Sequence, residues 1–233
     1  MPPVPVYIHM ETARKTTKKR SSGPAPDKII AAYKEYLLTQ GARPASVYKF
    51  CLDLGIREEE FYAHYGSFEG LDRSIWKQFI EQTVSTLEND KAFPEFSARE
   101  KVLALYYTLL EVLKANRSFA LLQLNENKNP AVVPGFLKDF KARFEDTVSQ
   151  ILNEAQKNGE VAVRPYLDKR YPKFFWLHLG LLLTYWKNDD SAGFEHTDAY
   201  VEKSVRLAFD MMGKGVLDSA IDFAKFIYQS KVK

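Results

Sequence analysis

Apolar side chains recur along the chain at the three- and four-residue spacing of amphipathic helices. Ile30, Tyr33 and Leu37 share one helical face, and Gly41 follows them as a stop signal. A second apolar face comes after that glycine, and Gly55 ends it in the same way. Its members stand at positions i, i+3, i+4 and i+7: Val47, Phe50, Cys51 and Leu54. The pattern predicts two short helices in succession.

A third short helix is expected directly after Gly55. Ile56 restarts the apolar pattern, and Phe61 and Tyr65 continue it four residues apart. Three short helices, of which the last two are joined by a glycine turn, describe a helix-turn-helix unit.

Residues 41–71 also resemble the N-terminal DNA-binding domain of the tetracycline-repressor-like (TetR) family. That family reads Gly, a gap, Thr-Ser-Val, a helix, Gly-Val-Ser-Lys-Gly-Thr-Leu-Tyr-His-His-Phe, then Ser-Lys-Glu and Leu. This chain follows the pattern without a gap at Gly41, Ser46, Val47, Gly55, Ile56, Tyr62, His64, Tyr65, Ser67, Glu69 and Leu71. The match covers about the N-terminal third of the chain. It implies a DNA-binding domain followed by a larger helical domain that receives a ligand and forms a homodimer.

The departures from the family pattern fall where relatives contact DNA. In place of Ser-Lys-Gly-Thr the chain has Arg57, Glu58, Glu59 and Glu60. Carboxylates suit the first turn of a helix, but here they would face one phosphate charge per ~1.7 Å of duplex. Phe68 replaces the family's lysine in Ser-Lys-Glu, which removes a phosphate contact. Scaffold positions are kept, whereas contact positions are changed.

Charge is distributed unevenly ahead of and within this unit. Residues 1–28 carry a net charge of +4, whereas residues 29–75 carry −2. A basic arm ahead of a helix-turn-helix can follow the DNA backbone or enter the minor groove. The alternative is a solvated, unstructured tail, which the acidic domain behind it favours.

The resemblance implies specific DNA contacts. Tyr62 matches the family tyrosine that contacts phosphate, and His64 matches a position close to the backbone, although an exposed polar role fits His64 equally well. The candidate DNA-binding residues are Ser46, Lys49, Arg57, Tyr62 and His64, with Lys18, Lys19 and Arg20 in the arm.

The rest of the chain reads as helices, with no alternating strand pattern. They are expected at 71–89, from Ser97 in a capping box with Glu100 to about 115, at 118–125, from Pro134 to about 158, at 172–187, at 197–213 with Thr197 as cap, and at 216–230. The helix at 172–187 is apolar on every side, which predicts burial on every side. The chain is therefore predicted to be all-α with about ten helices. Its expected parts are a disordered basic arm (1–26), a helix-turn-helix domain (27–70) and a ligand-binding and dimerisation domain (71–233).

Composition argues against several other classes of protein. Cys51 is the single cysteine among 233 residues, so an internal disulfide is excluded, and its place on an apolar stripe favours a small core residue. None of the four histidines has metal-ligand spacing, and no phosphate loop or nucleophile motif is present, so neither a metal, a cofactor nor an enzyme is expected. No signal peptide is visible, and the most apolar run, 174–186, is shorter than the ~20 residues of a membrane span. A soluble cytoplasmic protein is expected.

Aromatic residues are plentiful in the C-terminal part, where the resemblance implies a ligand site. His178, in the middle of an apolar helix, fits either a core residue bonded to a carbonyl or the polar handle of a ligand pocket. The candidate ligand-binding residues for an apolar small molecule are Trp76, Tyr106, Tyr107, Phe140, Trp176 and His178.

Three functions are therefore open. The first is a TetR-like transcriptional regulator, a homodimer that binds operator DNA and responds to a small apolar ligand, with an interface drawn from the last three helices. The second is a lipid- or isoprenoid-binding accessory protein that no longer binds DNA, similar in fold only to the lipid-binding protein of coenzyme Q biosynthesis. The third is a protein-interaction module whose acidic third helix meets a basic partner.

Overall fold

The computed structural model describes residues 26–126, 133–164 and 167–212. Within these ranges the regular structure is helical and no strand occurs, so the all-α prediction is confirmed. Short 3-10 turns lie at Phe93–Glu95, Gly135–Leu137, Asp168–Arg170 and Ala192–Phe194. The α-helices are α1 (Pro26–Gln40), α2 (Val47–Leu54), α3 (Glu58–Tyr62), α4 (Phe68–Glu88), α5 (Ala98–Lys114), α6 (Arg117–Glu126), α7 (Lys138–Lys157), α8 (Tyr171–Asn188) and α9 (Glu195–Met212).

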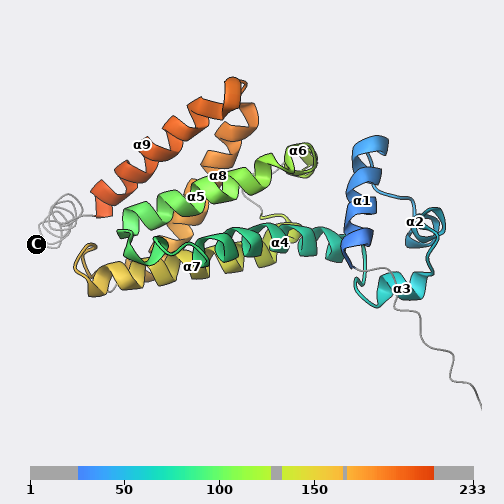
Figure 1. Ribbon diagram of the computed structural model, residues 1–233, viewed down its shortest axis with the longest axis horizontal. Coiled ribbons are helices and arrows are strands. Elements are labelled where there is room, and N and C mark those ends of the chain that lie inside the picture. Colours follow the sequence, from blue (N-terminus) through green and yellow to red (C-terminus); the bar gives the residue numbers. More distant parts are fainter. Residues whose placement is uncertain (1–25, 127–132, 165–166, 213–233) are drawn as a thin grey trace, which may run out of the picture.

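Helices α1 to α3 form a small unit at one end of the molecule (Figure 1). Phe50 of α2 lies at its centre, with the rings of Tyr33, Phe61 and Phe68 at centroid distances of 6.0, 6.2 and 5.7 Å. Cys51 is buried beside it, as its place on the apolar stripe predicts. The three helices are therefore held together mainly by aromatic packing.

The turn between α2 and α3 is closed by backbone bonds. Gly55 has φ +72°, and its N–H and that of Ile56 donate to the carbonyls of Leu52 and Cys51 at 3.1 and 2.9 Å. This left-handed residue satisfies carbonyls at the end of α2, which confirms the predicted glycine stop. At the other end of α2 the Ser46 hydroxyl accepts the Lys49 N–H at 3.1 Å and caps the helix.

Phe68 opens α4 and belongs to the core of the small unit. Its ring is parallel to that of Tyr33, with the centroids 5.3 Å apart. Helix α4 begins at Phe68, earlier than the predicted residue 71, because the Ser67 hydroxyl accepts the Gly70 N–H and caps it there. Phe68 stands where the TetR pattern has a lysine, and here it packs the start of α4 against the three-helix unit.

Helix α4 runs from the small unit into a larger helical domain and packs against α5 and α7 (Figure 1). The predicted capping box is present, since Glu100 Oε2 accepts the Ser97 N–H at 2.8 Å while the Ser97 hydroxyl accepts the Glu100 N–H. Helix α5 is central, because several of its side chains are fully buried: Val102, Leu105, Tyr106, Leu109 and Leu113.

The prediction that 172–187 is buried on every side is wrong for the single chain. Helix α8 packs mainly against α7 and α9, so one of its faces, with His178 and Leu182, is buried. The opposite face is apolar but exposed, by 41 to 62%: Phe174, Leu177, Leu181 and Tyr185. An all-apolar helix at the edge of a helical domain leaves the face that meets no neighbour uncovered.

The predicted cap at Thr197 is also wrong. Helix α9 begins two residues earlier, at Glu195, and the Thr197 N–H donates to Asp189 Oδ2 at 2.8 Å. The carboxylate of the preceding loop therefore does the capping. The helix predicted at 216–230 lies outside the described residues.

Candidate functional site

The outer surface of α2 and α3 is where the resemblance places DNA. Lys49 of α2 and Arg57 at the start of α3 are both mostly exposed. Lys49 Nζ lies 3.8 Å from Asp53 Oδ2. The Arg57 guanidinium lies 3.1 Å from Glu59 Oε2 and 3.2 Å from Glu60 Oε1. Both cations are therefore compensated by carboxylates of their own helices.

Tyr62 and His64 lie at the far end of α3. Tyr62 is 51% exposed, and its ring is perpendicular to that of Phe61 at a centroid distance of 5.6 Å. His64 is exposed in the turn after α3. The remaining predicted DNA contacts, Lys18, Lys19 and Arg20, lie outside the described residues.

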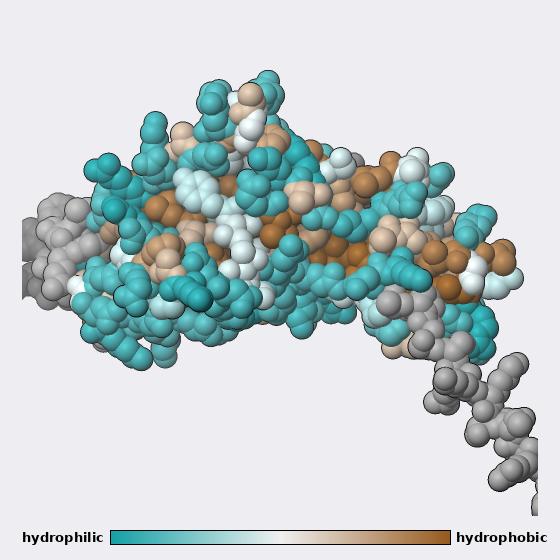
Figure 2. Space-filling view, in the orientation of Figure 1, coloured by the Kyte–Doolittle hydropathy of each residue, from teal (hydrophilic) through white to brown (hydrophobic). Residues whose placement is uncertain are grey.

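Two exposed apolar residues on α2 were missed by the sequence reasoning. Tyr48 and Leu52, one turn apart, are 62 and 63% exposed. Their i, i+4 spacing opposite the Phe50 stripe was the signal that could have found them. Figure 2 shows hydrophobic colour at this outer end of the three-helix unit.

A buried polar network joins the three-helix unit to the larger domain. Arg43, in the loop before α2, donates to Asp72 Oδ2 of α4 at 2.6 Å and to Glu69 Oε1 at 2.9 Å. Gln123 of α6 donates to the other oxygen of Asp72 and accepts the Trp76 indole N–H at 3.1 Å. Asp72, Gln123 and Trp76 are at most 1% exposed. The network therefore links α4 and α6 through buried groups, and the partly exposed Arg43 extends it to the loop before α2.

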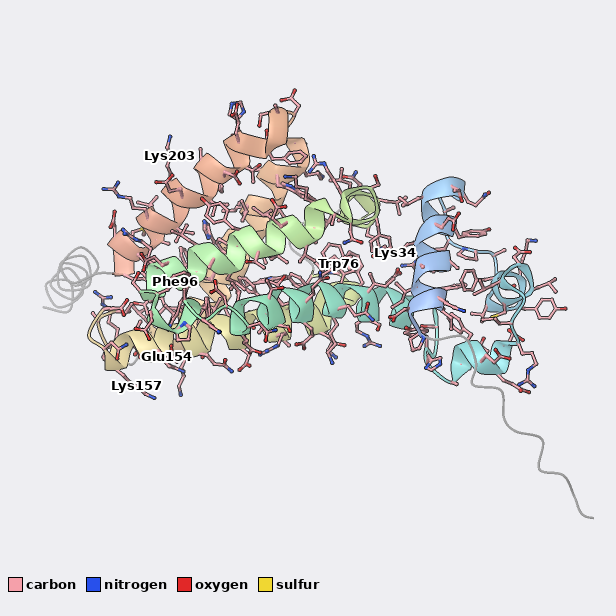
Figure 3. The ribbon with its side chains drawn as sticks, viewed as in Figure 1. Lys34, Trp76, Phe96, Glu154, Lys157 and Lys203 are labelled. Carbon is pink, nitrogen blue, oxygen red and sulfur yellow. The ribbon has the colours of Figure 1, made fainter. Side chains whose placement is uncertain are left out.

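Lys34 makes a second contact across the same junction (Figure 3). Its ammonium donates to Asn116 Oδ1 and lies 5.6 Å from the Phe79 ring centroid and 5.7 Å from that of Phe119. Burial lowers the pKa of Lys34. Helix α1 is thereby held against the segment between α5 and α6.

The larger domain contains a chain of aromatic rings that starts at the polar network. Successive centroid distances are 5.8 Å from Trp76 to Phe140, 6.1 Å to Trp176, 6.1 Å to Phe144, 6.1 Å to Tyr106 and 5.3 Å to His178. The structure thus brings together five of the six predicted ligand residues. Tyr107 is apart from them, because its hydroxyl donates to the Asp198 carbonyl of α9 at 3.3 Å.

His178 ends this aromatic chain with one ring nitrogen unpaired. Its Nδ1 lies 2.9 Å from the Tyr106 hydroxyl, which itself donates to the Phe175 carbonyl at 3.3 Å. Which of Nδ1 and the Tyr106 hydroxyl donates in this bond depends on the imidazole tautomer, and Nε2 takes the opposite role to Nδ1. Among the described residues Nε2 is buried without a hydrogen-bond partner. Burial lowers the pKa of His178, so the ring is neutral near pH 7. The direct partner of this histidine is a hydroxyl group, not the predicted carbonyl.

Two hollows are found elsewhere in the described part of the chain. One, of about 390 Å³, lies between the end of α8 and the start of α9 and is lined by Leu181, Thr184, Tyr185, Asn188, Asp189, Asp190, His196 and Tyr200. The other, of about 120 Å³, is lined by Val84, Leu87, Glu88, Phe93, Lys101, Thr147, Gln150, Ile151 and Glu154. Neither is lined by the aromatic chain.

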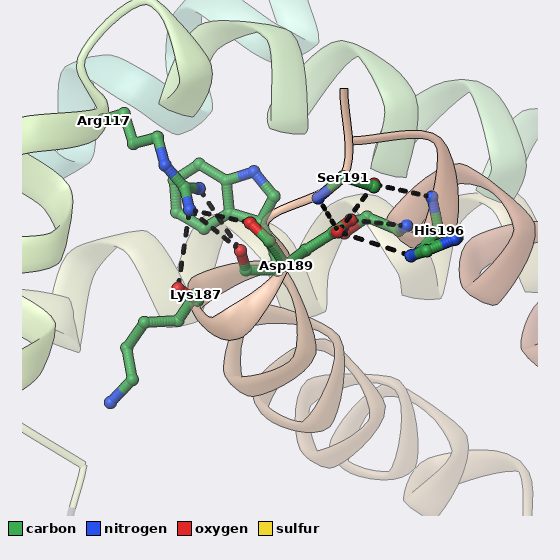
Figure 4. Close-up of polar contacts among 7 residues, drawn as sticks. Arg117, Lys187, Asp189, Ser191 and His196 are labelled. Carbon is green, nitrogen blue, oxygen red and sulfur yellow. Dashed lines mark hydrogen bonds and ion pairs between the residues drawn. The ribbon is translucent and has the colours of Figure 1, made fainter. Parts of the chain in front are cut away.

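The polar wall of the larger hollow has a structural role (Figure 4). The Asp189 carboxylate accepts hydrogen bonds from the backbone N–H and the hydroxyl of both Ser191 and Thr197. These bonds lower the pKa of Asp189, and the bond from the Thr197 hydroxyl has the largest effect. Arg117 donates to the Trp186 carbonyl at 3.2 Å and closes the end of α8. These groups anchor the α8–α9 connection.

Within the described residues no cluster of three or more histidine, cysteine or carboxylate side chains is arranged to hold a metal ion. None of the helices described is long and apolar enough to cross a membrane.

The fold and the site define a helical protein that carries a helix-turn-helix unit ahead of a larger helical domain. The family model for the tetracycline-repressor-like C-terminal domain matches residues 101–227, more than half of the chain. The chain therefore belongs to the TetR family.

Solved structures of TetR proteins share the fold. A protein from Syntrophomonas wolfei assigned to the TetR-family transcriptional regulators is 16% identical, with a TM-score of 0.67 over 82% of this chain and 96% of that one. The fatty acid degradation regulator FadR from Bacillus halodurans is 15% identical, with a TM-score of 0.58 over 78% and 97%. The TetR regulator from Nitrosomonas europaea is 15% identical, with a TM-score of 0.55 over the same shares. A search of curated proteins found no match.

Proposed function

We propose that this protein is a homodimeric transcriptional regulator whose three-helix unit binds operator DNA and whose larger domain binds a small apolar ligand. The division falls near residue 70. The observation that carries the proposal is the polar network in which Arg43 pairs with the buried Asp72, Asp72 with the buried Gln123, and Gln123 with the buried Trp76. It joins the unit that would meet DNA to the aromatic chain that would meet the ligand, so a change in one can bias the other.

The exposed apolar surface of the last described helices supports the dimer. Besides the α8 face, α9 exposes Leu207 by 60% and Met211 by 43%. Contiguous apolar surface of this kind marks interaction sites, and a twofold dimer covers the same patch on both copies.

The aromatic chain supports the ligand. Trp76, Phe140, Trp176 and Tyr106 offer apolar contact, and Nε2 of His178 can form one hydrogen bond. The ligand class is thus an apolar molecule with one hydrogen-bonding group such as a hydroxyl. Binding requires the α7 and α8 side chains to separate around it.

Fluorescence anisotropy of the full chain on labelled duplex from upstream of its own gene tests the DNA step. Affinity is expected to fall about 10³-fold or more between 50 and 200 mM salt if about six phosphates are contacted. Tyr62→Phe is expected to weaken binding about tenfold, because a hydrogen bond to a charged group is lost. The matched variant Tyr200→Phe, on α9, should bind as the parent does. No binding at 50 mM salt would contradict the proposal.

A second function is favoured by the ion pairs of Lys49 and Arg57, which leave the α2–α3 surface without an uncompensated cation among its described residues. In this alternative the protein binds a lipid or isoprenoid and no longer binds DNA. Native mass spectrometry that shows a co-purified lipid, together with no DNA affinity, would support it. Changing Glu58, Glu59 and Glu60 to Lys separates the two functions, since binding gained only then would identify the glutamates as the obstacle.

A further inference from the structure

The outer surface of α2 and α3 combines exposed apolar groups with acidic charge. Tyr48, Leu52 and Tyr62 are each more than half exposed. Side chains of Asp53 and Glu59 are 49 and 81% exposed. Residues 47–62 carry a net charge of −2. We call these five exposed residues the α2–α3 face; its chemistry suits a segment that is both apolar and basic.

We propose that the N-terminal arm of this same chain docks on the α2–α3 face and covers it in the DNA-free protein. Residues 1–25 carry a net charge of +4, with five cations and one carboxylate. An apolar stretch comes first, with Val4, Val6, Tyr7, Ile8 and Met10, and the cations follow at Arg14, Lys15, Lys18, Lys19 and Arg20. The arm therefore carries apolar side chains that can cover the exposed apolar groups of the face and cations that can pair with its carboxylates.

The attachment point of the arm is close enough for such docking. The start of α1 lies near the turn after α3 (Figure 1), and the Asp27 carboxylate there adds to the rise in the pKa of Tyr65 that burial causes. The six residue-to-residue steps from Arg20 to Pro26 span up to about 20 Å when extended. A short tether gives a local concentration of about millimolar, so even a millimolar contact is substantially populated.

The consequence is a competition for one surface. The arm and a phosphate backbone carry opposite charges, and a face of net charge −2 attracts the first and repels the second. Operator DNA then binds once the arm leaves the face, and the arm cations become available to phosphates. Docking itself does not require the proposed DNA function, so the two are tested separately.

Carbodiimide crosslinking of the full chain in the absence of DNA tests the docking. The reagent activates carboxylates, and a nearby lysine amine forms an amide with loss of the activated group. Peptide mapping is expected to place Lys15, Lys18 and Lys19 mainly on Asp53, Glu58 and Glu59 at 50 mM salt. At 1 M salt these crosslinks should decrease, because the screening length falls from about 14 Å to about 3 Å.

A second readout uses trypsin, which cleaves after the arm cations. The full chain carrying Asp53→Asn, Glu58→Gln and Glu59→Gln is expected to lose its arm about threefold faster than the parent, as for a local concentration near twice the Kd. The control variant Asp90→Asn with Glu95→Gln, exposed carboxylates near the start of α5, should match the parent. Crosslinks spread over all exposed carboxylates, or equal cleavage of the three proteins, would overturn the proposal. Protection of the arm only after duplex is added would also overturn it and assign the arm to DNA.

Discussion

At the residue scale, Asp72 joins the two parts of the molecule. Its carboxylate receives Arg43 from the loop before α2 on one oxygen and Gln123 from α6 on the other, and it is fully buried. A buried charge is tolerated only when it is paired and hydrogen-bonded. Removal of the carboxylate would take one hydrogen-bond acceptor from Arg43 and one from Gln123.

Replacement of Asp72 by Ala is expected to lower the free energy of unfolding by about 2 kcal/mol, because it removes the acceptor of the buried Gln123 amide and a carboxylate paired with Arg43. Urea denaturation measures the change. The matched variant Asp53→Ala removes a half-exposed carboxylate of a surface ion pair and should change stability by no more than about 0.5 kcal/mol. Equal effects of the two changes would show that the network does not hold the parts together.

At the element scale, the joint between α2 and α3 depends on the backbone of a single residue. Gly55 occupies the left-handed region and lets two N–H groups return to the end of α2. An added Cβ would meet no atom within 4 Å there, so any cost of substitution is one of backbone conformation.

Gly55→Ala is expected to destabilise the protein by about 1 kcal/mol, the cost of a non-glycine residue in the left-handed region. The control is Gly66→Ala, since Gly66 is equally open to a Cβ but has no positive φ. It should be neutral or slightly stabilising. Thermal unfolding of the two variants is compared, and a loss of similar size in both would contradict this account of the turn.

At the scale of the whole molecule, α8 and α9 leave apolar surface uncovered among the described residues, and this surface supports the proposed dimer. One face of α8 packs on α7 and α9, while its exposed face holds residues as apolar as those inside. A second copy related by a twofold axis would remove this surface from water.

Leu177→Glu together with Leu181→Glu is expected to convert the proposed dimer into a monomer, because each change would place a charge in the proposed interface on both copies. Light scattering coupled to gel filtration measures the mass. Leu38→Glu, on α1, is the matched change of an exposed leucine outside the α8 face and should leave the dimer intact. A dimer that persists in the double variant would place the interface elsewhere.

Local signals made most elements predictable. The Ser97 and Glu100 pair and the glycine at position 55 act within a few residues, so their effect is visible in the sequence. Five of the six aromatic candidates also meet in space, because large apolar side chains on several helices share one core. The prediction that Thr197 caps α9 failed because the capping carboxylate belongs to Asp189, in the loop before the helix. Asp189 accepts hydrogen bonds from Thr197 only once that loop is folded.

By itself, the sequence determined the helical class, the helix-turn-helix spacing and the acidic start of α3, because periodicity, glycine stops and charge are local properties. Only the tertiary structure decided which apolar residues are covered. Phe68 is inside because Tyr33 of another helix stacks on it, and Leu177 is outside because no helix among those described packs there. Burial depends on neighbours brought together by folding, and a hydrophobic side chain reads the same in the sequence whether or not such a neighbour arrives.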